Sequence, residues 1–354
     1  MFKEDKKPIF ASNAPHIRDG SSVKKIMWTV VLALMPAAVY SVYIFGLRVL
    51  TLYAASVLAA MIAETLMRFL LKKNITSLDG SAVITGILVA MNVPPASPIW
   101  MPAIGSAFAI VIVKQLFGGL GFNIFNPALA ARAFMLASWP VYMTTGWAVS
   151  GNVTSQVSAN SSVFPQAVFD VMTHATPLTA LKEGTRMLAD YNIKIEDFCA
   201  FLFSPEMIWS QFKGSIGGCI GETSALLLLI GGLILLVRRV ITWHIPVSYI
   251  ITMALLTFVY YSLIGYPHPQ MIVLSHILTG GLILGAFFMA TDMVTSPVSR
   301  KGMLLFGAGC GLITFVIRIW GGYPEGVSYS ILLMNAATPL IDRFTKPKVF
   351  GRHN

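Results

Sequence analysis

Three charged residues interrupt the apolar stretches of this sequence, and they have the chemistry to move protons or other ions. Glu64 and Arg132 lie inside apolar segments, and Asp292 lies at the end of another one. An ionisable group inside a membrane is costly, so it tends to face a partner or a cavity and to mark an ion pathway. We interpret Glu64, Arg132 and Asp292 as candidate ion-path residues, with buried ion pairing as the alternative.

The composition indicates what kind of element must position these charges. Of the 354 residues, 56% are hydrophobic and 11% are charged, and the mean hydropathy is +0.73. Water-soluble domains contain about 25% charged residues. The composition therefore excludes a water-soluble enzyme and is typical of an all-α polytopic membrane protein. The three cysteines show no paired spacing, which predicts no metal site, iron–sulfur cluster or disulfide framework.

Ten apolar segments are candidates for membrane-spanning helices, each of which needs about 20 residues. The long segments are 27–45, 49–71, 101–117, 223–237, 244–264, 274–291 and 303–320, and the shorter ones are 81–92, 126–138 and 326–341. A polar interruption separates the first five from the last five. The expected divisions are an N-terminal segment (1–26), a five-helix half (27–139), an insert (140–221), a second five-helix half (222–342) and a tail (343–354).

Short strings recur in the same order in the two halves. Ile84-Thr85-Gly86 resembles Leu278-Thr279-Gly280, Gly118-Gly119 matches Gly321-Gly322, and Asn126-Pro127-Ala128-Leu129 is echoed at 335–340. Because five is an odd number of helices, the halves would be inverted repeats, which place binding sites at their interface. The alternative is that glycine and Asn-Pro simply punctuate membrane helices.

The formal net charge of +10 is explained by membrane topology, without a nucleic-acid partner. If the N-terminal segment is cytoplasmic, most Lys and Arg residues fall in loops on that side, as the positive-inside rule requires. They include Lys24, Lys25, Arg238, Arg239, Arg300, Lys301, Arg343 and Lys346. We therefore expect both termini in the cytoplasm, the insert outside and the helices in contact with lipid.

The insert carries a threonine-rich block, Asp170-Val171-Met172-Thr173-His174-Ala175-Thr176-Pro177-Leu178-Thr179. On its residues alone, the block reads as a helix start, with Thr176 as the N-cap and Pro177 in the first turn.

The same block resembles the flavin-attachment signature of membrane redox subunits, in which an Asp precedes a Ser/Thr-Gly-Ala-Thr string by six residues. In that family a transferase uses FAD and leaves FMN esterified through its phosphate to the last Thr. The resemblance implies Thr176 as the acceptor, and Asp170, Thr173 and Ala175 as recognition elements. His174 stands where Gly is usual. Gly permits positive φ, which His tolerates better than most residues, and the effect of this departure is left open.

Further strings extend the resemblance over most of the chain. Ser81-Ala82-Val83-Ile84-Thr85-Gly86 and the run Gly-Gly-Leu-Gly-Phe-Asn-Ile-Phe-Asn-Pro-Ala at 118–128 are similar to the D subunits of Rnf ion-translocating electron transport complexes. The B subunit of the sodium-translocating NADH:quinone oxidoreductase is related to them. The resemblance implies a bacterial cytoplasmic-membrane subunit that works only with other membrane and peripheral subunits, after a flavin transferase has matured it. Its complex couples electron transfer between ferredoxin and NAD to Na⁺ or H⁺ movement, and the sequence leaves the ion open.

The resemblance also implies two cofactors, a covalent FMN on Thr176 and a non-covalent riboflavin among the helices. Proteins tune flavins through hydrogen bonds and nearby charge, so amides and hydroxyls near helix breaks are the candidates for the second site. They are Asn92, Asn126, Asn335, Thr85 and Thr279. A helix cap or an interhelical hydrogen bond is the alternative for each. A secondary transporter and a cofactor-free scaffold subunit remain as alternative functions.

Overall fold

The computed structural model describes residues 22–74, 76–144, 147, 176, 178–182, 203–214, 217–222, 224–322 and 325–346. Throughout these ranges the regular elements are helices, and none of the described residues forms a strand. The all-α prediction is therefore confirmed. The predicted recognition elements Asp170, Thr173, His174 and Ala175 lie outside the described residues.

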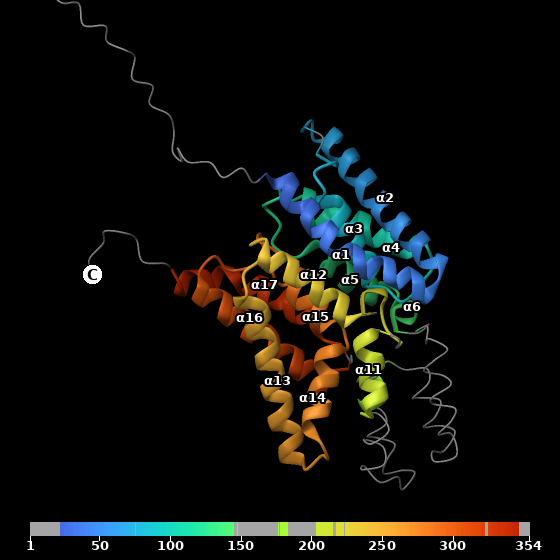
Figure 1. The fold of residues 1–354 in the computed structure, drawn as a ribbon. Coiled ribbons are helices and arrows are strands. Elements are labelled where there is room, and N and C mark those ends of the chain that lie inside the picture. Colours follow the sequence, from blue (N-terminus) through green and yellow to red (C-terminus); the bar gives the residue numbers. More distant parts are fainter. Residues whose placement is uncertain are drawn as a thin grey trace, which may run out of the picture.

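The first half begins with two long helices, α1 (Val23–Phe45) and α2 (Leu47–Leu70). Gly46, at φ +85°, separates them, a conformation that favours glycine. Then follow α3 (Ser81–Met91), α4 (Trp100–Phe108) with its π-helical continuation η1 (Ala109–Gln115), α5 (Pro127–Ser138) and α6 (Pro140–Thr144). In this half α2 packs against α3 and α4 (Figure 1).

The second half is preceded by α11 (Pro205–Lys213) and a 3-10 turn, η2 (Ile220–Glu222). It consists of α12 (Ala225–Val237), α13 (His244–Ile264), α14 (Pro269–Leu278), α15 (Leu282–Leu284) with the π-helical η3 (Gly285–Met289), α16 (Arg300–Trp320) and α17 (Val327–Phe344). Here α13 packs against α14 and α16, and α16 packs against α17.

The ten predicted segments all fall on helices, but one was wrongly predicted to be continuous. The segment 274–291 breaks between α14 and α15, where the helix directions differ by 59°. The cause is the pair Gly280-Gly281, both at φ +66°, which ends one helix and starts the next. Among the described helices, α1, α2, α13 and α16 are long and apolar enough to cross a membrane, and the bent pair makes a fifth span.

The two halves meet through α1 against α12 and α5 against α17 (Figure 1). The strings matched at the sequence level do not occupy equivalent places. Thr85 lies inside α3, whereas Thr279 lies at the break. Asn126 is the N-cap of α5, whereas Asn335 lies within α17. A better match for Gly80, which begins α3 with a left-handed φ, is Gly281, which begins α15 in the same way. The inverted repeat itself stays a prediction.

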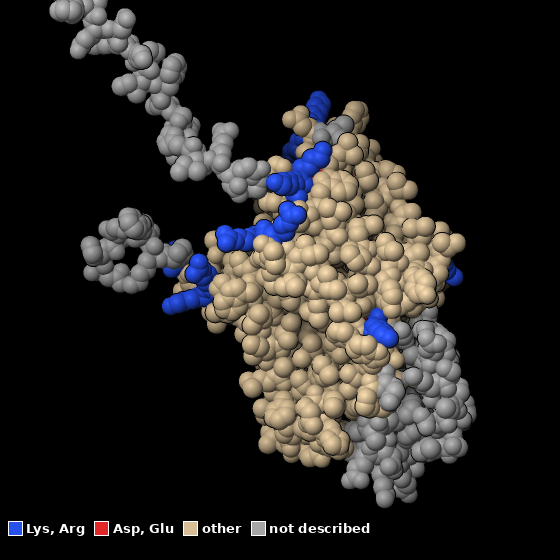
Figure 2. All heavy atoms as spheres, viewed as in Figure 1, with Lys and Arg blue, Asp and Glu red and all other residues tan. Residues whose placement is uncertain are grey.

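The surface is divided as a membrane protein requires. Large apolar side chains such as Leu32, Ile62 and Leu263 are exposed along α1, α2 and α13. Lys and Arg gather at the end of the molecule where α1 begins and α17 ends (Figure 2). That arrangement leaves an apolar belt for lipid and one basic rim.

Candidate functional site

A cavity of about 140 Å³ lies between the two halves. Its walls come from α1, α3, η1, α5, α12 and η3, so both π-helical segments border it. The lining is mostly apolar and includes Phe287 and Phe288. Three predicted site residues, Thr85, Asn126 and Asp292, are among the polar groups of the wall.

Each of these three residues also has a structural partner. Asn126 Oδ1 accepts from the backbone N–H of Ala128 at 3.0 Å, and its Nδ2 donates to the Met289 carbonyl at 3.2 Å, which ties α5 to η3. Thr85 Oγ1 donates to the Ser81 carbonyl at 3.0 Å. The half-buried Asp292 carboxylate lies in the loop after η3 and accepts from the Val294 N–H at 3.2 Å.

The Asp292 carboxyl is the titratable acid of the cavity wall. Burial raises its pKa above the ordinary value, and the hydrogen bond from the Val294 N–H partly offsets that shift. The Asp292 carboxyl therefore takes up a proton at a higher pH than the carboxyl of a surface aspartate does.

The fourth predicted residue, Glu64, forms a buried network beside the cavity. We call Glu64, Lys114, Gln115 and Ser81 the Glu64 cluster. Lys114 Nζ lies 3.0 Å and 3.1 Å from the two Glu64 oxygens, and Gln115 Nε2 donates to Oε1 at 3.1 Å. Lys114 also donates to Ser81 Oγ at 2.7 Å, and both of these residues line the cavity. For Glu64, the observed contacts are those of a buried ion pair, the alternative to an ion-path role.

Arg132 belongs to a second buried network, which joins the two halves. Its Nη1 donates to Asn92 Oδ1 at 2.8 Å, and its Nη2 forms an ion pair with Glu325 at the start of α17. Asn92 also donates to the Leu88 carbonyl at 2.7 Å. The structure thus joins two predicted residues, Asn92 and Arg132, away from the residues of the cavity wall.

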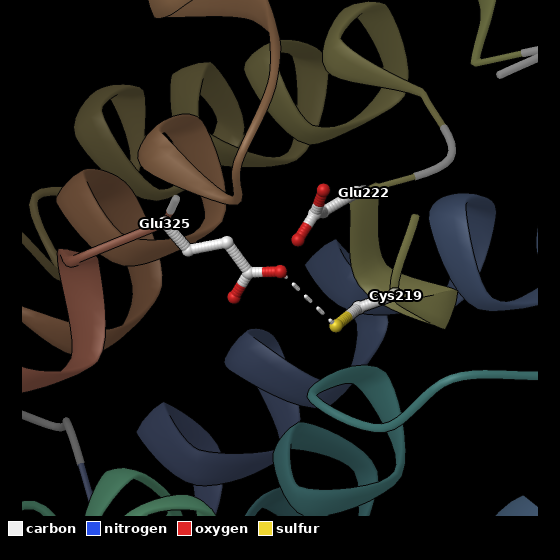
Figure 3. Close-up of side chains that lie close together, drawn as sticks. All are labelled: Cys219, Glu222 and Glu325. Atoms are coloured by element: carbon white, nitrogen blue, oxygen red, sulfur yellow. Dashed lines mark hydrogen bonds between the residues drawn. The ribbon is translucent and has the colours of Figure 1, made fainter. Parts of the chain in front are cut away.

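Cys219 and Glu222 complete this second network (Figure 3). The Cys219 thiol lies 3.9 Å from Glu325 Oε1 and 3.6 Å from the Asn92 carbonyl. Glu222 is only 6% exposed, and its carboxyl points toward Cys219 and Glu325. We call Cys219, Glu222, Glu325, Arg132 and Arg318 the Glu222 cluster. Sequence reasoning named Arg132 as a candidate ion-path residue but did not bring these five residues together, because they come from segments far apart and no spacing relates them.

Arg318 holds the break between α14 and α15. Its guanidinium donates to the carbonyls of Thr279 at 3.1 Å and Gly280 at 3.2 Å, and also to the His276 carbonyl. Its Nε donates to the Glu325 carbonyl at 2.9 Å. The predicted residue Thr279 therefore contributes its carbonyl to this contact, while its hydroxyl donates to Ser275 O at 2.6 Å.

The predicted acceptor Thr176 is 3% exposed. Its Oγ1 lies 2.9 Å from Thr179 Oγ1 and accepts from the Thr179 N–H at 3.3 Å, as the capping alternative describes. The helical residues 178–182 that follow pack on the second half. A Cβ at Gly280 would lie 2.5 Å from Leu178 Cδ1, and Lys182 Nζ donates to the Gly321 carbonyl.

The last predicted residue, Asn335, contacts another one. In the amide orientation that satisfies both of its groups, Asn335 accepts from the Asn126 backbone N–H at 3.1 Å and donates to Ile331 O at 3.2 Å. Asn335 is 1% exposed. It therefore supports the start of α5 from α17, at the interface between the halves.

Fold and site together define a polytopic all-α membrane protein with two buried charge networks and a cavity between its two halves. The chain belongs to the NQR2, RnfD, RnfE family, whose model matches residues 10–351.

Similar proteins cover nearly the whole chain. The D subunit of the Na⁺-translocating ferredoxin:NAD⁺ oxidoreductase complex of Acetobacterium woodii is 46% identical over 96% of this chain and 94% of its own length. Its counterpart in the proton-translocating ferredoxin:NAD⁺ oxidoreductase complex of Clostridium ljungdahlii is 46% identical over 98% of this chain and 97% of its own. The corresponding protein of the ion-translocating oxidoreductase complex of Stutzerimonas stutzeri is 40% identical over 94% of this chain and 93% of its own.

Proposed function

We propose that this chain is the D subunit of an ion-translocating ferredoxin:NAD⁺ oxidoreductase complex and carries electrons within it on flavins. The observation that supports this most strongly is the 46% identity, over at least 96% of the chain, to two D subunits of ferredoxin:NAD⁺ oxidoreductase complexes. One of them belongs to a Na⁺-translocating complex and the other to a proton-translocating one. Overall similarity therefore does not select the coupling ion.

The covalent FMN belongs on Thr176 in this proposal. The Thr176 hydroxyl is the chemical requirement for a phosphoester, and Leu178, two residues further on, packs against Gly280 at the helix break. Because this hydroxyl is buried and bonded to Thr179, a transferase must act before residues 178–182 pack against the second half. The bound flavin would supply an acceptor and donor of electrons.

The non-covalent flavin, proposed to be riboflavin, belongs in the cavity between the halves. Phe287 and Phe288 in its wall offer apolar surface for an aromatic ring system. Hydrogen-bonding groups come from Thr85, Asn123 and Asn126. The Lys114 ammonium adds positive charge to the wall, which favours a reduced, anionic flavin. Asn92, Asn335 and Thr279 do not line this cavity and act as supports.

We place the subunit in a bacterial inner membrane with both termini in the cytoplasm. The basic rim where α1 begins and α17 ends supports this orientation (Figure 2). It puts the Glu64 cluster, near the Lys-rich loop after α2, toward the cytoplasm.

Mass spectrometry of the purified complex, produced with its flavin transferase, tests the covalent assignment. We expect an FMN adduct on the peptide that contains Thr176, in the wild type and in Thr179→Ala, and its loss in Thr176→Ala. Thr179→Ala is the matched control because it removes the neighbouring hydroxyl that contacts Thr176.

An unmodified Thr176 peptide from an active complex would contradict the covalent flavin. A complex without any flavin in this subunit would instead favour the transporter or scaffold functions. A transporter would then show substrate binding in the cavity between the halves. A scaffold subunit would bind neither flavin nor substrate.

A further inference from the structure

Glu222 is a buried acid with an unused oxygen. The side chain is 6% exposed, and its Oε1 has no hydrogen-bond donor among the described residues. Removing a carboxylate oxygen from water without a partner is costly, so such a group either holds a proton or takes up a cation. The carboxyl points toward Cys219 and Glu325, and the three ligand atoms lie within 4.8 Å of one another (Figure 3).

The charged groups around Glu222 are already engaged with other partners. Arg132 pairs with Glu325 and Asn92, and Arg318 donates to backbone carbonyls. The groups that face Glu222 from the packed elements are Cys219, Glu325, Arg132, Arg318 and His276. The His276 ring contacts Arg318 through Nδ1, and its Nε2 has no partner among the described residues. Glu222 is thus the carboxyl of the cluster without its own ion pair.

A proton fits this site better than a metal ion. Hard cations need six or more oxygen ligands, whereas Glu222 finds one thiol and one carboxylate, and that carboxylate is paired with Arg132. Two guanidinium groups nearby would repel a metal cation. They also oppose protonation of the Glu222 carboxyl, but a proton carries one charge and needs no further ligands.

The Gly280-Gly281 pair separates Glu222 from the predicted flavin-bearing segment. A Cβ at Gly280 would lie 2.5 Å from Leu178 Cδ1, and a Cβ at Gly281 would lie 3.7 Å from Glu222 Oε1. Thr176 is two residues before Leu178. Thr176 and Glu222 are both buried, and the two glycines connect their surroundings, so negative charge gained near Thr176 acts on Glu222 through protein, where electrostatic interactions are stronger than in water.

We propose that Glu222 is a proton-exchanging group whose protonation follows the redox state of the electron carrier at Thr176. When an electron, supplied by the complex's own donors, reaches that carrier, the Glu222 carboxylate takes one proton from water. When the electron leaves for the next carrier, the same O–H bond breaks and the proton returns to water. The proposal rests on the proposed function, which supplies the carrier.

Reduced-minus-oxidised infrared difference spectra of the intact complex test this. We expect a protonated carboxyl C=O band that appears on reduction, shifts in D₂O, is lost in Glu222→Gln and is moved, but kept, in Glu222→Asp. Asp342→Asn is the matched control, because Asp342 accepts from the Val298 N–H at 3.1 Å near the end of α17, and it should leave the band unchanged.

Absence of the band, or a band that survives in Glu222→Gln, overturns the proposal. A band that depends on Na⁺ in place of K⁺ at constant pH also overturns it, in favour of a sodium site. If Glu222→Gln does not assemble, the Glu222→Asp shift decides. Mass spectrometry of the same sample separates a failure of the proposed function from a failure of this inference. An unmodified Thr176 contradicts the proposed function. A modified Thr176 without the Glu222 band contradicts only the inference about Glu222.

Discussion

The Glu64 cluster and the Glu222 cluster are both buried, but they differ in how completely their acids are paired. Both oxygens of Glu64 face the Lys114 ammonium, within elements of one half. Glu222 joins residues from both halves, and its Oε1 has no donor among the described residues. A fully paired charge stabilises one arrangement, whereas an incompletely paired one can respond to charge elsewhere. The difference teaches that burial of an acid alone does not mark an ion pathway.

The largest effect should follow from removing Arg318, which donates to four backbone carbonyls around the Gly280-Gly281 break. Each buried acceptor left without a donor costs about 1–3 kcal/mol, so Arg318→Met should prevent stable folding of the subunit. The measurement is the folded elution peak of the complex after heating. Arg48→Met is the control, since exposed Arg48 also donates to a carbonyl, that of Ala96, at 2.9 Å and should change little. A stable Arg318→Met subunit would show that the Gly280-Gly281 break keeps its conformation without the hydrogen bonds from Arg318.

A smaller but still large loss is expected from Glu64→Gln. Breaking a buried ion pair by removing one partner costs about 3–5 kcal/mol, because Lys114 stays buried without its counter-charge. The double variant Glu64→Leu with Lys114→Met should recover at least half of the loss, measured as the denaturant midpoint of the complex. If the single variant is as stable as the wild type, Lys114 has another counter-charge and the Glu64 cluster is not a self-contained pair.

A more moderate effect is expected from filling the cavity, which is lined by members of the Glu64 cluster but not by those of the Glu222 cluster. Leu120 lines it, whereas Phe122 in the same loop is 68% exposed and does not. Leu120→Trp should fill part of the space and weaken non-covalent flavin binding at least about tenfold, or about 1.4 kcal/mol, while Phe122→Trp should not. Flavin released on denaturation and quantified by chromatography is the measurement. Equal flavin content in both variants would exclude this cavity as the second flavin site.

The smallest change in stability is expected for Glu222→Gln. No ion pair of Glu222 is broken among the described residues, and the Oε1 atom has no hydrogen bond to lose, so the free energy of unfolding should change by less than about 1 kcal/mol. Compared with Glu64→Gln under the same denaturant conditions, this variant tests the contrast directly. A loss as large as that of Glu64→Gln would mean that both acids are structural.

The sequence predicted the helical segments well because membrane helices depend on long apolar runs, and it predicted the start of α5 because Asn126-Pro127 is a strong capping signal. It failed at 274–291, where apolar residues continue across the Gly280-Gly281 break. Of the residues predicted to bind the second flavin, Thr85 and Asn126 lie on the cavity wall, whereas Asn92 contacts Arg132.

The grouping of the Glu222 cluster was beyond sequence reasoning for a physical reason. Cys219, in the segment before the second half, meets Glu325, just before α17, and neither lies within an apolar run that would make its charge or polarity conspicuous. Only tertiary packing shows that these groups are buried.

The two π-helical segments give the cavity wall an unusual sensitivity to chain length. In η1 the Leu116 N–H bonds to Val111 O, and in η3 the Ala290 N–H bonds to Gly285 O, so each turn holds one residue more than an α-helical turn. Deleting a single residue from such a turn would let it close as an ordinary α-helical turn, while the helix beyond it kept its orientation. In η1 the side chains within the turn, Lys114 among them, would then shift relative to the cavity wall. The loss of one residue from either turn should therefore disturb the cavity wall more than the helix packing beyond it.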